Sequence, residues 1–368
     1  MTGSLRGGTP HAQVLVTGAT GFLGRHLLRA LSAAQLPAAV LVRQRDAWGA
    51  EPWHAEVGPV SVIEGQALSS EAWRADTRLG EVRTVFHAAG MVRHTRSATE
   101  EMTEFNVRGT LEMVQVAARL GARLVFVSSS GTVGCFRSAD IHAEEDAPYA
   151  EALAGRWPYY ASKIRAEREA RALAEKLGVE LTIVRPPILL GPDDHRRRST
   201  GYVQKVLDGK VPLVPSGGIA FTDVRDVASA LARLAQLENA RDIYHLPGTA
   251  TTLRDFFGMV TEVSGAPAVE RTLPRWAALG LARFSQLGST LYPSLPDPVV
   301  LEMATCFWGL ASLFAHELGY APRPGRQTLC DTADWLRANP APHGAHSAPK
   351  KRTPRRPRQR RIDPHVSA

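Results

Sequence analysis

Short runs of apolar and β-branched residues alternate with longer amphipathic segments over the first two-thirds of the chain. This alternation is typical of repeated strand–helix–strand units, so it predicts an α/β fold built on a parallel sheet. The expected strands are residues 13–17, 38–42, 59–63, 84–87, 124–128 and 181–185. The expected helices are residues 22–34, 69–74, 100–120 and 159–177, and they stop near Pro37, Gly121 and Gly178.

The pattern changes after Arg185, where proline and glycine become frequent. Such a segment is typical of a loop-rich lobe around a binding cleft. A helix is expected over residues 226–237 and a short strand over 243–246. Thr252-Leu-Arg-Asp255 is a capping pattern, so it predicts the start of another helix.

The positive charge of the chain is concentrated at its C-terminal end. Of 44 lysines and arginines, eight lie in residues 341–368, beside the single acid Asp363. Residues 1–340 hold 36 basic and 35 acidic side chains, so the net charge is no argument for a nucleic-acid function. Residues 340–368 are rich in proline and arginine and lack aromatic residues. We therefore expect a disordered basic tail that contacts polyanions only weakly and binds no specific nucleic acid.

Cysteine and hydropathy patterns point to an ordinary intracellular protein. The three cysteines, at positions 135, 306 and 330, have no metal-site spacing, so reduced thiols and no metal centre are expected. No signal peptide is visible in the first ten residues, and a cytoplasmic location is expected. Residues 299–318 come nearest to a transmembrane segment but contain Glu302, His316 and Glu317, so they predict a core helix and no transmembrane segment.

The segment from Thr17 to Gly24 (Thr-Gly-Ala-Thr-Gly-Phe-Leu-Gly) lies between an expected strand and an expected helix, the context that makes a glycine pattern informative. Gly18 permits a tight turn, Gly21 lets the backbone approach a pyrophosphate, and Gly24 lets the helix pack on the strand. The helix N-terminus adds free N–H groups and the positive end of its dipole. The sequence therefore predicts a dinucleotide site.

The residues after the second strand bear on the choice of cofactor. A fold that prefers NAD places an acid there, about 20 residues past the glycines, for the ribose 2′-hydroxyl. This chain has Arg43 instead, and a guanidinium binds a 2′-phosphate with charge-assisted hydrogen bonds. We expect NADP(H) to be favoured over NAD(H). In the alternative, Arg43 faces solvent and Asp46 contacts the ribose.

The chain resembles the extended short-chain dehydrogenase/reductases, also called the NAD-dependent epimerase/dehydratase family, over about residues 12–336. Besides the glycine motif, the matching segments are Phe86-His-Ala-Ala89, Asn106-Val-Arg-Gly-Thr110, Val127-Ser-Ser-Ser130, Tyr159-x-x-x-Lys163, Arg185-Pro-Pro187, Asp223-Val-Arg-Asp226 and Glu317-Leu-Gly-Tyr320-x-Pro322. Within the family the chain is most similar to dihydroflavonol-reductase-like and 3β-hydroxysteroid-dehydrogenase-like oxidoreductases.

The resemblance implies a Rossmann-type, doubly wound parallel sheet with a smaller C-terminal substrate lobe. After a flexible N-terminus of residues 1–11, residues 12–185 form the NADP-binding domain that carries the catalytic residues. Residues 186–339 form the substrate lobe, interleaved with the last sheet elements. Family members also lead us to expect a homodimer formed through the helices of residues 100–120 and 159–177.

Tyr159 and Lys163 are four residues apart in an expected helix, so their side chains share one face. A nearby ammonium lowers the pKa of a tyrosine, which can then exchange a proton with a carbonyl/alcohol pair. Tyr160 has no lysine four residues further on. The resemblance implies that Lys163 also holds the nicotinamide ribose. It also implies a third catalytic residue, whose hydroxyl makes a hydrogen bond to the substrate oxygen. This residue is Ser130, with Ser129 as the alternative.

The remaining site residues follow from the resemblance. The implied cofactor contacts are Gly18, Thr20, Gly21, Phe22, Leu23, Gly24, Arg43, Gln66, His87, Ala88, Ala89, Tyr159, Lys163 and Pro186. Gln66 replaces an aspartate that contacts the adenine in many members, and its amide keeps that hydrogen-bonding ability. Asn106 is expected to brace the active-site helix. Asp223 and Asp226 are interpreted as a fold signature and His87 as a packed strand-end residue.

Three functions compete. The first is an NADP(H)-dependent oxidoreductase that interconverts a ketone or aldehyde and an alcohol on a small, fairly apolar substrate. The second is a nucleotide-sugar epimerase or dehydratase with tightly bound NAD. Gly131-Thr132-Val133, which lacks the acids of sugar dehydratases, and the amide-free segment 185–192 count against it. The third is a non-catalytic NADP-binding regulatory protein, which is disfavoured because Ser130, Tyr159 and Lys163 are all present.

Overall fold

The computed structural model describes residues 11–49, 52–269, 271–288 and 296–340. Most of the expected flexible N-terminus and basic tail, residues 1–10 and 341–368, lies outside the described residues. Among the described helices, none has the length and hydropathy needed to cross a membrane. The thiols of Cys135, Cys306 and Cys330 are all free.

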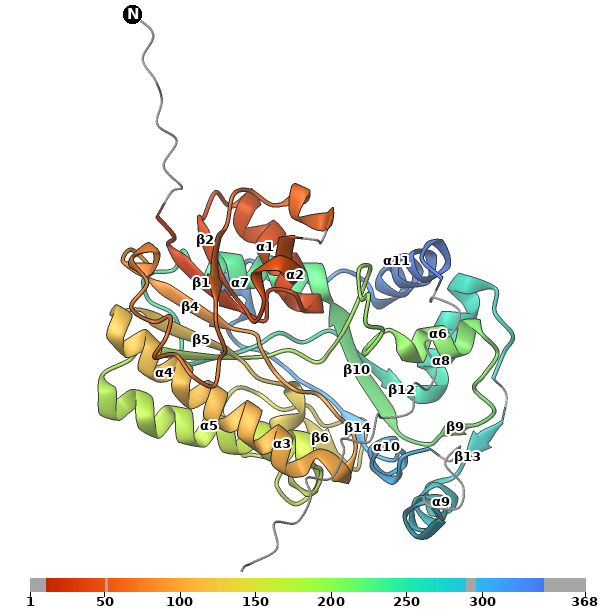
Figure 1. Cartoon of the computed structure of the whole chain (residues 1–368). Helices are drawn as coiled ribbons and strands as arrows, with labels where there is room; N and C mark the ends of the chain where they lie inside the picture. The colour runs from red at the N-terminus through yellow and green to blue at the C-terminus, as the bar shows by residue number, and fades with distance from the viewer. Residues whose placement is uncertain (1–10, 50–51, 270, 289–295, 341–368) are drawn as a thin grey trace, which may run out of the picture.

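A seven-stranded parallel sheet in the order β11-β7-β5-β4-β1-β2-β3 forms the centre of the molecule (Figure 1). Its strands are β1 (Val14–Thr17), β2 (Ala38–Val42), β3 (Ser61–Glu64), β4 (Thr84–His87), β5 (Arg123–Val127), β7 (Leu181–Arg185) and β11 (Ile243–His245). The six expected strands all occur, with ends that differ by at most two residues. Strands β1, β2, β4 and β5 are buried along their whole length, because helices cover both faces of the sheet.

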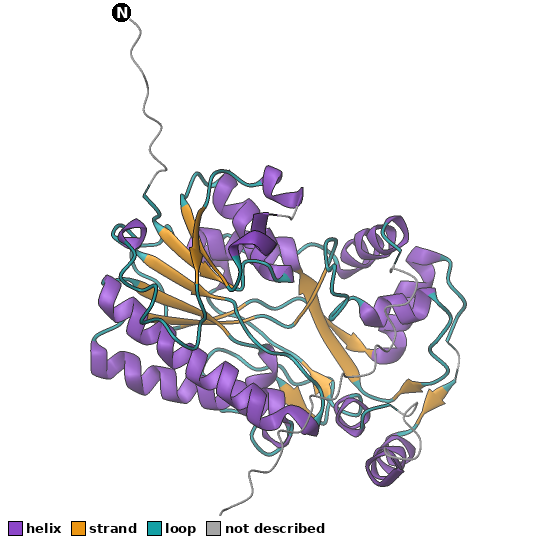
Figure 2. Ribbon diagram, viewed as in Figure 1, coloured by secondary structure: helices purple, strands orange, loops and turns teal. Residues whose placement is uncertain are grey.

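Two layers of helices enclose the sheet, as Figure 2 shows, so the predicted doubly wound α/β fold is confirmed. One face is covered by α1 (Phe22–Ala33), α2 (Arg45–Gly49) and α7 (Val224–Leu234), and the other by α3 (Thr99–Thr103), α4 (Gly109–Leu120) and α5 (Pro158–Leu177). Leu27 and Leu31 of α1 pack with Leu231 of α7 in the first core. Met113 of α4 and Ala170 of α5 belong to the second.

The expected single helix of residues 100–120 is divided by a π turn, Glu104–Arg108, between α3 and α4. Asn106 lies in this turn, and its side-chain amide donates hydrogen bonds to Ser162 Oγ (2.9 Å) and to the Met91 carbonyl (3.0 Å). Its side-chain oxygen accepts one from the Met91 N–H (2.8 Å). Asn106 therefore braces α5, the helix of Tyr159 and Lys163, since Ser162 belongs to α5.

The helix expected over residues 69–74 is wrong, because this segment forms successive turns. The Trp73 indole N–H donates to the carbonyls of Gln66 and Ser69, both at 3.0 Å. The Ser70 N–H donates to the carboxylate of Glu112 on α4 at 2.9 Å. These side-chain hydrogen bonds stabilise the turns in place of a helix.

The core helix expected over residues 299–318 is also wrong beyond its first turn. It is helical only in α10 (Pro298–Met303), after which β14 (Phe307–Trp308) pairs antiparallel with β6 (Cys135–Phe136). Gly309 then lies so close to the chain that a Cβ there would be 2.8 Å from the Ile141 carbonyl oxygen. Pairing with a strand distant in sequence therefore overrides the apolar pattern.

The C-terminal lobe is built on a three-stranded sheet in the order β12-β10-β8. It comprises β8 (Ile188–Leu190), α6 (Gly201–Leu207), β9 (Val214–Pro215), β10 (Gly218–Asp223), β12 (Thr249–Thr252), α8 (Leu253–Ser264), β13 (Thr272–Leu273), α9 (Arg275–Gly288) and α11 (Gly325–Ala338). Phe221, Phe256 and Leu329 pack in its core. The Thr252 hydroxyl accepts from the Asp255 N–H at 3.0 Å, which confirms the predicted cap of α8.

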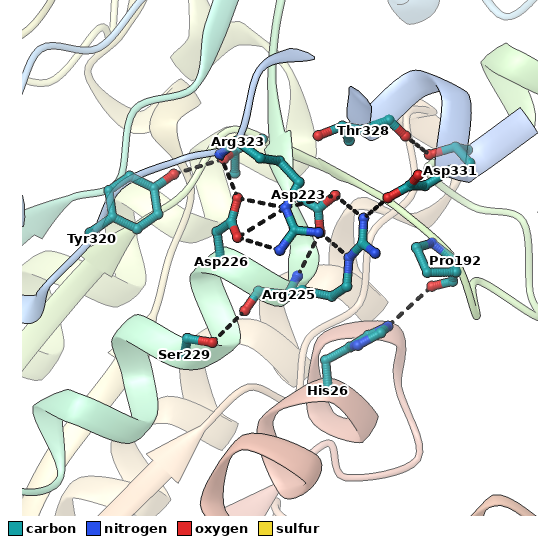
Figure 3. A network of polar contacts seen from close by, with 12 residues as sticks. His26, Pro192, Asp223, Arg225, Asp226, Ser229, Tyr320, Arg323, Thr328 and Asp331 are labelled. Carbon is teal, nitrogen blue, oxygen red and sulfur yellow. Dashed lines mark hydrogen bonds and ion pairs between the residues drawn. The ribbon is translucent and has the colours of Figure 1, made fainter. Parts of the chain in front are cut away.

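An ion-pair network joins the start of α7 to the C-terminal part of the chain (Figure 3). The buried Asp223 carboxylate caps α7 and pairs with Arg225, which also reaches Asp331 of α11. Asp226 pairs with Arg323 at 2.7 Å. Although burial opposes ionisation, the hydrogen bonds from Arg225 hold the pKa of Asp223 below its usual value. These contacts agree with the interpretation of both aspartates as a fold signature.

Candidate active site

A cavity of about 350 Å³ opens at the carboxyl ends of the central strands, between the sheet and the C-terminal lobe. Open α/β sheets bind their ligands at this edge. The structure brings ten of the predicted site residues together in its lining: Gly18, Gly21, Phe22, Leu23, Gly24, Ala88, Ser130, Tyr159, Lys163 and Pro186. Residues as distant in the sequence as Phe22 and Pro187 thus face one space.

Five other predicted cofactor contacts lie outside this lining: Thr20, Arg43, Gln66, His87 and Ala89. Arg43 directly follows β2 and Gln66 follows β3, so both lie at the carboxyl edge of the sheet, and both are exposed. His87 is buried at the end of β4. The structure therefore places Arg43 and Gln66 beyond the cavity, toward the β2–β3 edge of the sheet.

The glycine turn has the geometry of a site for an anionic group. Gly18 adopts φ +75°, and a Cβ there would lie 2.6 Å from the Ala89 nitrogen. A Cβ on Gly24 would clash with the Gly18 carbonyl oxygen. No side chain caps α1 and no acid lies in its first turn, so the first N–H groups of the helix are free to bind phosphate oxygens. These residues fit the pyrophosphate of a dinucleotide.

Tyr159 lies in the first turn of α5, and it lines the cavity together with Ser129. Burial raises the pKa of Tyr159 to about 12, and the Ser129 side chain offsets only part of that rise. The prediction that Lys163 lowers the pKa of Tyr159 is therefore wrong, because burial dominates. Tyr159 is protonated at neutral pH.

Ser129 and Ser130 both line the cavity with Tyr159, and Ser129 is the serine that lowers the pKa of Tyr159. Ser130 lines the same cavity, and its backbone N–H donates to the Pro186 carbonyl at 2.8 Å. Strand β5 ends at Val127, and Ser129 then caps the short turn Ser130–Thr132. Because three serines are consecutive here, the sequence pattern alone could not distinguish Ser129 from Ser130.

Lys163 is buried with its ammonium inside the site. Its Nζ donates to the Val127 carbonyl at 2.9 Å and lies 4.6 Å from the centre of the Phe126 ring. Burial lowers the pKa of Lys163 to about 8, while the Glu167 carboxylate acts in the opposite direction. Lys163 therefore keeps most of its positive charge at neutral pH.

His87 is a packed residue at the end of β4, as interpreted from the sequence. Its Nδ1 lies 2.8 Å from the Thr17 hydroxyl, and its side chain is buried. Burial, with a smaller effect of the Lys163 charge, lowers the pKa of His87 to about 3. The imidazole is therefore neutral in the folded protein throughout the physiological range.

We expect the buried His87 to make the protein sensitive to acid. Between pH 6.5 and about 3 the unfolded chain binds a proton that the folded chain does not, so the free energy of unfolding falls as the pH drops. Between pH 7 and 5 this group alone removes about 2 kcal/mol. Urea denaturation at both pH values should show this loss in the wild type and a smaller one in His87→Asn. An equal loss in both proteins would contradict the prediction.

His94 is a cavity residue that the sequence did not predict. It follows β4 in a loop, and its ring centre lies 5.7 Å from that of Tyr159. Its Nδ1 is buried and has no hydrogen-bond partner among the described residues. The only signal for it in the sequence was its place shortly after the carboxyl end of β4. Met303 and Trp308, which also line the cavity, had no such signal.

Comparison with known proteins supports this picture. Residues 14–246 match the model of the "NAD dependent epimerase/dehydratase family". The chain is 27% identical to a putative dihydroflavonol 4-reductase of Synechocystis sp., over 87% of this chain and 93% of the relative. It is 35% identical to the 3 beta-hydroxysteroid dehydrogenase type 7 of Homo sapiens, over 84% and 90% of the two chains. Its fold matches the Thermus thermophilus UDP-glucose 4-epimerase complex with NAD (TM-score 0.67, 24% identity, 89% and 99% coverage).

Proposed function

The chain belongs to the NAD dependent epimerase/dehydratase family and is an NAD(P)-dependent oxidoreductase, and from this premise we propose that it reduces a ketone or aldehyde with NADPH. The observation that carries the proposal is the protonated Tyr159 in a cavity that also contains Ser129, Lys163 and the N-terminus of α1. A proton donor of this kind suits reduction, because the substrate oxygen must gain a proton.

The residues of the chain divide the work as follows. When bound, the nicotinamide cofactor supplies the hydride. Tyr159 donates its hydroxyl proton to the substrate oxygen, and Ser129 and Ser130 orient that oxygen by hydrogen bonding. Lys163 would hold the nicotinamide ribose, and its charge stabilises the tyrosinate that remains after proton transfer. The free N–H groups of α1 would bind the pyrophosphate.

The walls of the cavity suit a fairly apolar substrate. The side chains that the lobe contributes include Ile188, Leu189, Ile219, Leu253, Phe256, Phe257, Met303 and Trp308. Burying an apolar side chain or ligand group of similar size against such walls contributes about 1.5–3 kcal/mol. The lobe also contributes the polar side chains Asp194, Arg196, Arg198, Ser199 and Tyr202, which are partners for a polar or anionic substituent of the substrate. Because apolar side chains form the larger part of the lobe's contribution to the lining, we favour a carbonyl on a fairly apolar skeleton over a nucleotide sugar.

Arg43 tests the choice of cofactor. In the described part of the chain its guanidinium has no ion-pair or hydrogen-bond partner, and it is exposed at the end of β2. We expect Arg43→Ala to weaken NADPH binding about 10- to 100-fold, because one charge-assisted contact contributes about 1.5–3 kcal/mol. NADH binding should stay unchanged. Fluorescence titration of the purified protein with both nucleotides measures the two affinities.

Arg83→Ala is the matched control, because Arg83 is an exposed arginine that precedes β4 at the opposite edge of the sheet. It should leave both affinities unchanged. A wild type that prefers NADH would assign the ribose to Asp46 and favour an epimerase with bound NAD. Binding of neither nucleotide would contradict the proposed reaction altogether.

A further inference from the structure

A second hollow, of about 290 Å³, lies beside the substrate cavity on the other side of one chain segment. Met303, Ala304 and Trp308 of this segment line the substrate cavity, whereas Glu302 and Cys306 line the second hollow. Five of the nine residues around the second hollow, which we call the arginine hollow, are arginines: Arg96, Arg137, Arg156, Arg275 and Arg283. They come from separate parts of the chain, and α9 supplies the last two, so folding gathers them.

The charge of the arginine hollow is largely uncompensated. Its one carboxylate, Glu302, pairs with Arg96 at 3.0 Å and also accepts the Trp157 indole N–H at 2.8 Å. Within the described residues, the other four arginines have no ion-pair partner. The first 340 residues hold 36 basic and 35 acidic side chains, so this excess is local and does not reflect the general composition.

Helix α9 places two of these arginines in an electrostatically unfavourable way. Arg275 is its first residue, where the positive end of the helix dipole disfavours a cation, and its first turn has no acid. Arg283 lies two turns further on, with Leu279 between them, so all three residues face the hollow. An anion bound among these side chains would be attracted both by the arginines and by the positive end of the helix dipole, and would offset their mutual repulsion.

We propose that the arginine hollow binds phosphate groups, carried either by a phosphorylated small molecule or by a lipid headgroup. A guanidinium matches phosphate with two parallel charge-assisted hydrogen bonds, which favours phosphate over a monovalent anion. The hollow has room for a pyrophosphate-sized group. Next to Arg275 and Arg283 on α9, Trp276 and Phe284 are 78% and 54% exposed, a pattern that a lipid surface would also accommodate.

The first arm of the test uses inorganic pyrophosphate and the full-length protein at constant ionic strength. Isothermal titration should show that Arg275→Ala/Arg283→Ala weakens binding at least about tenfold, since two charge-assisted contacts are lost. The control, Arg119→Ala/Arg233→Ala, removes the same charge from exposed positions in the last turns of α4 and α7 and should bind like the wild type. Neither double variant changes pyrophosphate binding at the first turn of α1, so a difference in affinity between the two variants reports on the arginine hollow.

The second arm identifies the source of the phosphate. The same three proteins are sedimented with vesicles of phosphatidylcholine, with and without about 30% phosphatidylglycerol. If Arg275→Ala/Arg283→Ala alone loses vesicle binding and none of the proteins binds pyrophosphate, the site is assigned to a lipid headgroup. If that variant alone loses pyrophosphate binding and vesicle binding is the same in all three proteins, the site is assigned to a soluble phosphate compound. Binding through the basic tail is equal in all three proteins. If the hollow and control variants behave alike in both arms while keeping wild-type thermal unfolding, the proposal is overturned. Both arms measure binding alone, so they are independent of the proposed reaction.

Discussion

Replacing Tyr159 by phenylalanine should lower turnover about 10²- to 10⁴-fold while leaving NADPH affinity within about twofold. The substitution removes one hydroxyl and keeps the ring, which packs 5.0 Å from that of Tyr160 and 5.7 Å from that of His94. Because burial raises the pKa of Tyr159 to about 12, the hydroxyl is a proton donor at neutral pH, and phenylalanine has none to offer. Oxidation of NADPH with a panel of apolar ketones measures kcat, and nucleotide titration measures binding.

Tyr160→Phe is the matched control for this substitution. Tyr160 is the adjacent residue on α5, and among the described residues its hydroxyl has no hydrogen-bond partner. Its ring packs against Gly131, so phenylalanine keeps that contact. Tyr160→Phe should therefore retain kcat within about threefold, since proton transfer to the substrate oxygen does not involve it. Equal losses in the two variants would contradict the role assigned to Tyr159.

The central fold was predictable because its signals are local and redundant. Strands such as Thr84–His87 are buried on both faces, so their apolar runs leave little freedom of interpretation. The sequence-based predictions failed where contacts between residues distant in the sequence determine the structure. Ser70 is held by Glu112, and Trp308 is paired with Cys135 across the chain, and neither contact can be inferred from a window of neighbouring residues.

The candidate site divides in the same way. The glycine turn and the four-residue spacing of Tyr159 and Lys163 predicted residues that line the same cavity, since both patterns depend on local geometry. The spacing could not predict burial, which raises the pKa of Tyr159 and lowers that of Lys163. His94 was missed because a loop residue without a motif becomes a cavity residue only through the path of the folded chain.

Arg185 shows how a motif residue acquires its physical reason from the structure. In the sequence it belongs to a family motif and has no evident partner. In the structure it pairs with Glu167 of α5 at 2.6 Å, and the two side chains are only 2% and 0% exposed. The Glu167 carboxylate also accepts the Ser128 hydroxyl, and Arg185 lies 3.2 Å from His245 Nε2. The pair therefore fixes α5, which carries Tyr159 and Lys163, to the end of β7.

Arg185→Met should lower the free energy of unfolding by about 3–5 kcal/mol, because it leaves the Glu167 carboxylate buried without its cation. Urea denaturation at pH 7 measures the loss. The double variant Arg185→Met/Glu167→Leu should regain at least about half of it, since no unpaired charge remains and apolar side chains of similar volume fill the space. Part of the loss should persist, because the Ser128 hydroxyl has lost its acceptor. A double variant as unstable as the sum of both single variants would mean that the charge pair itself, rather than the penalty of an unpaired ion, holds α5 in place.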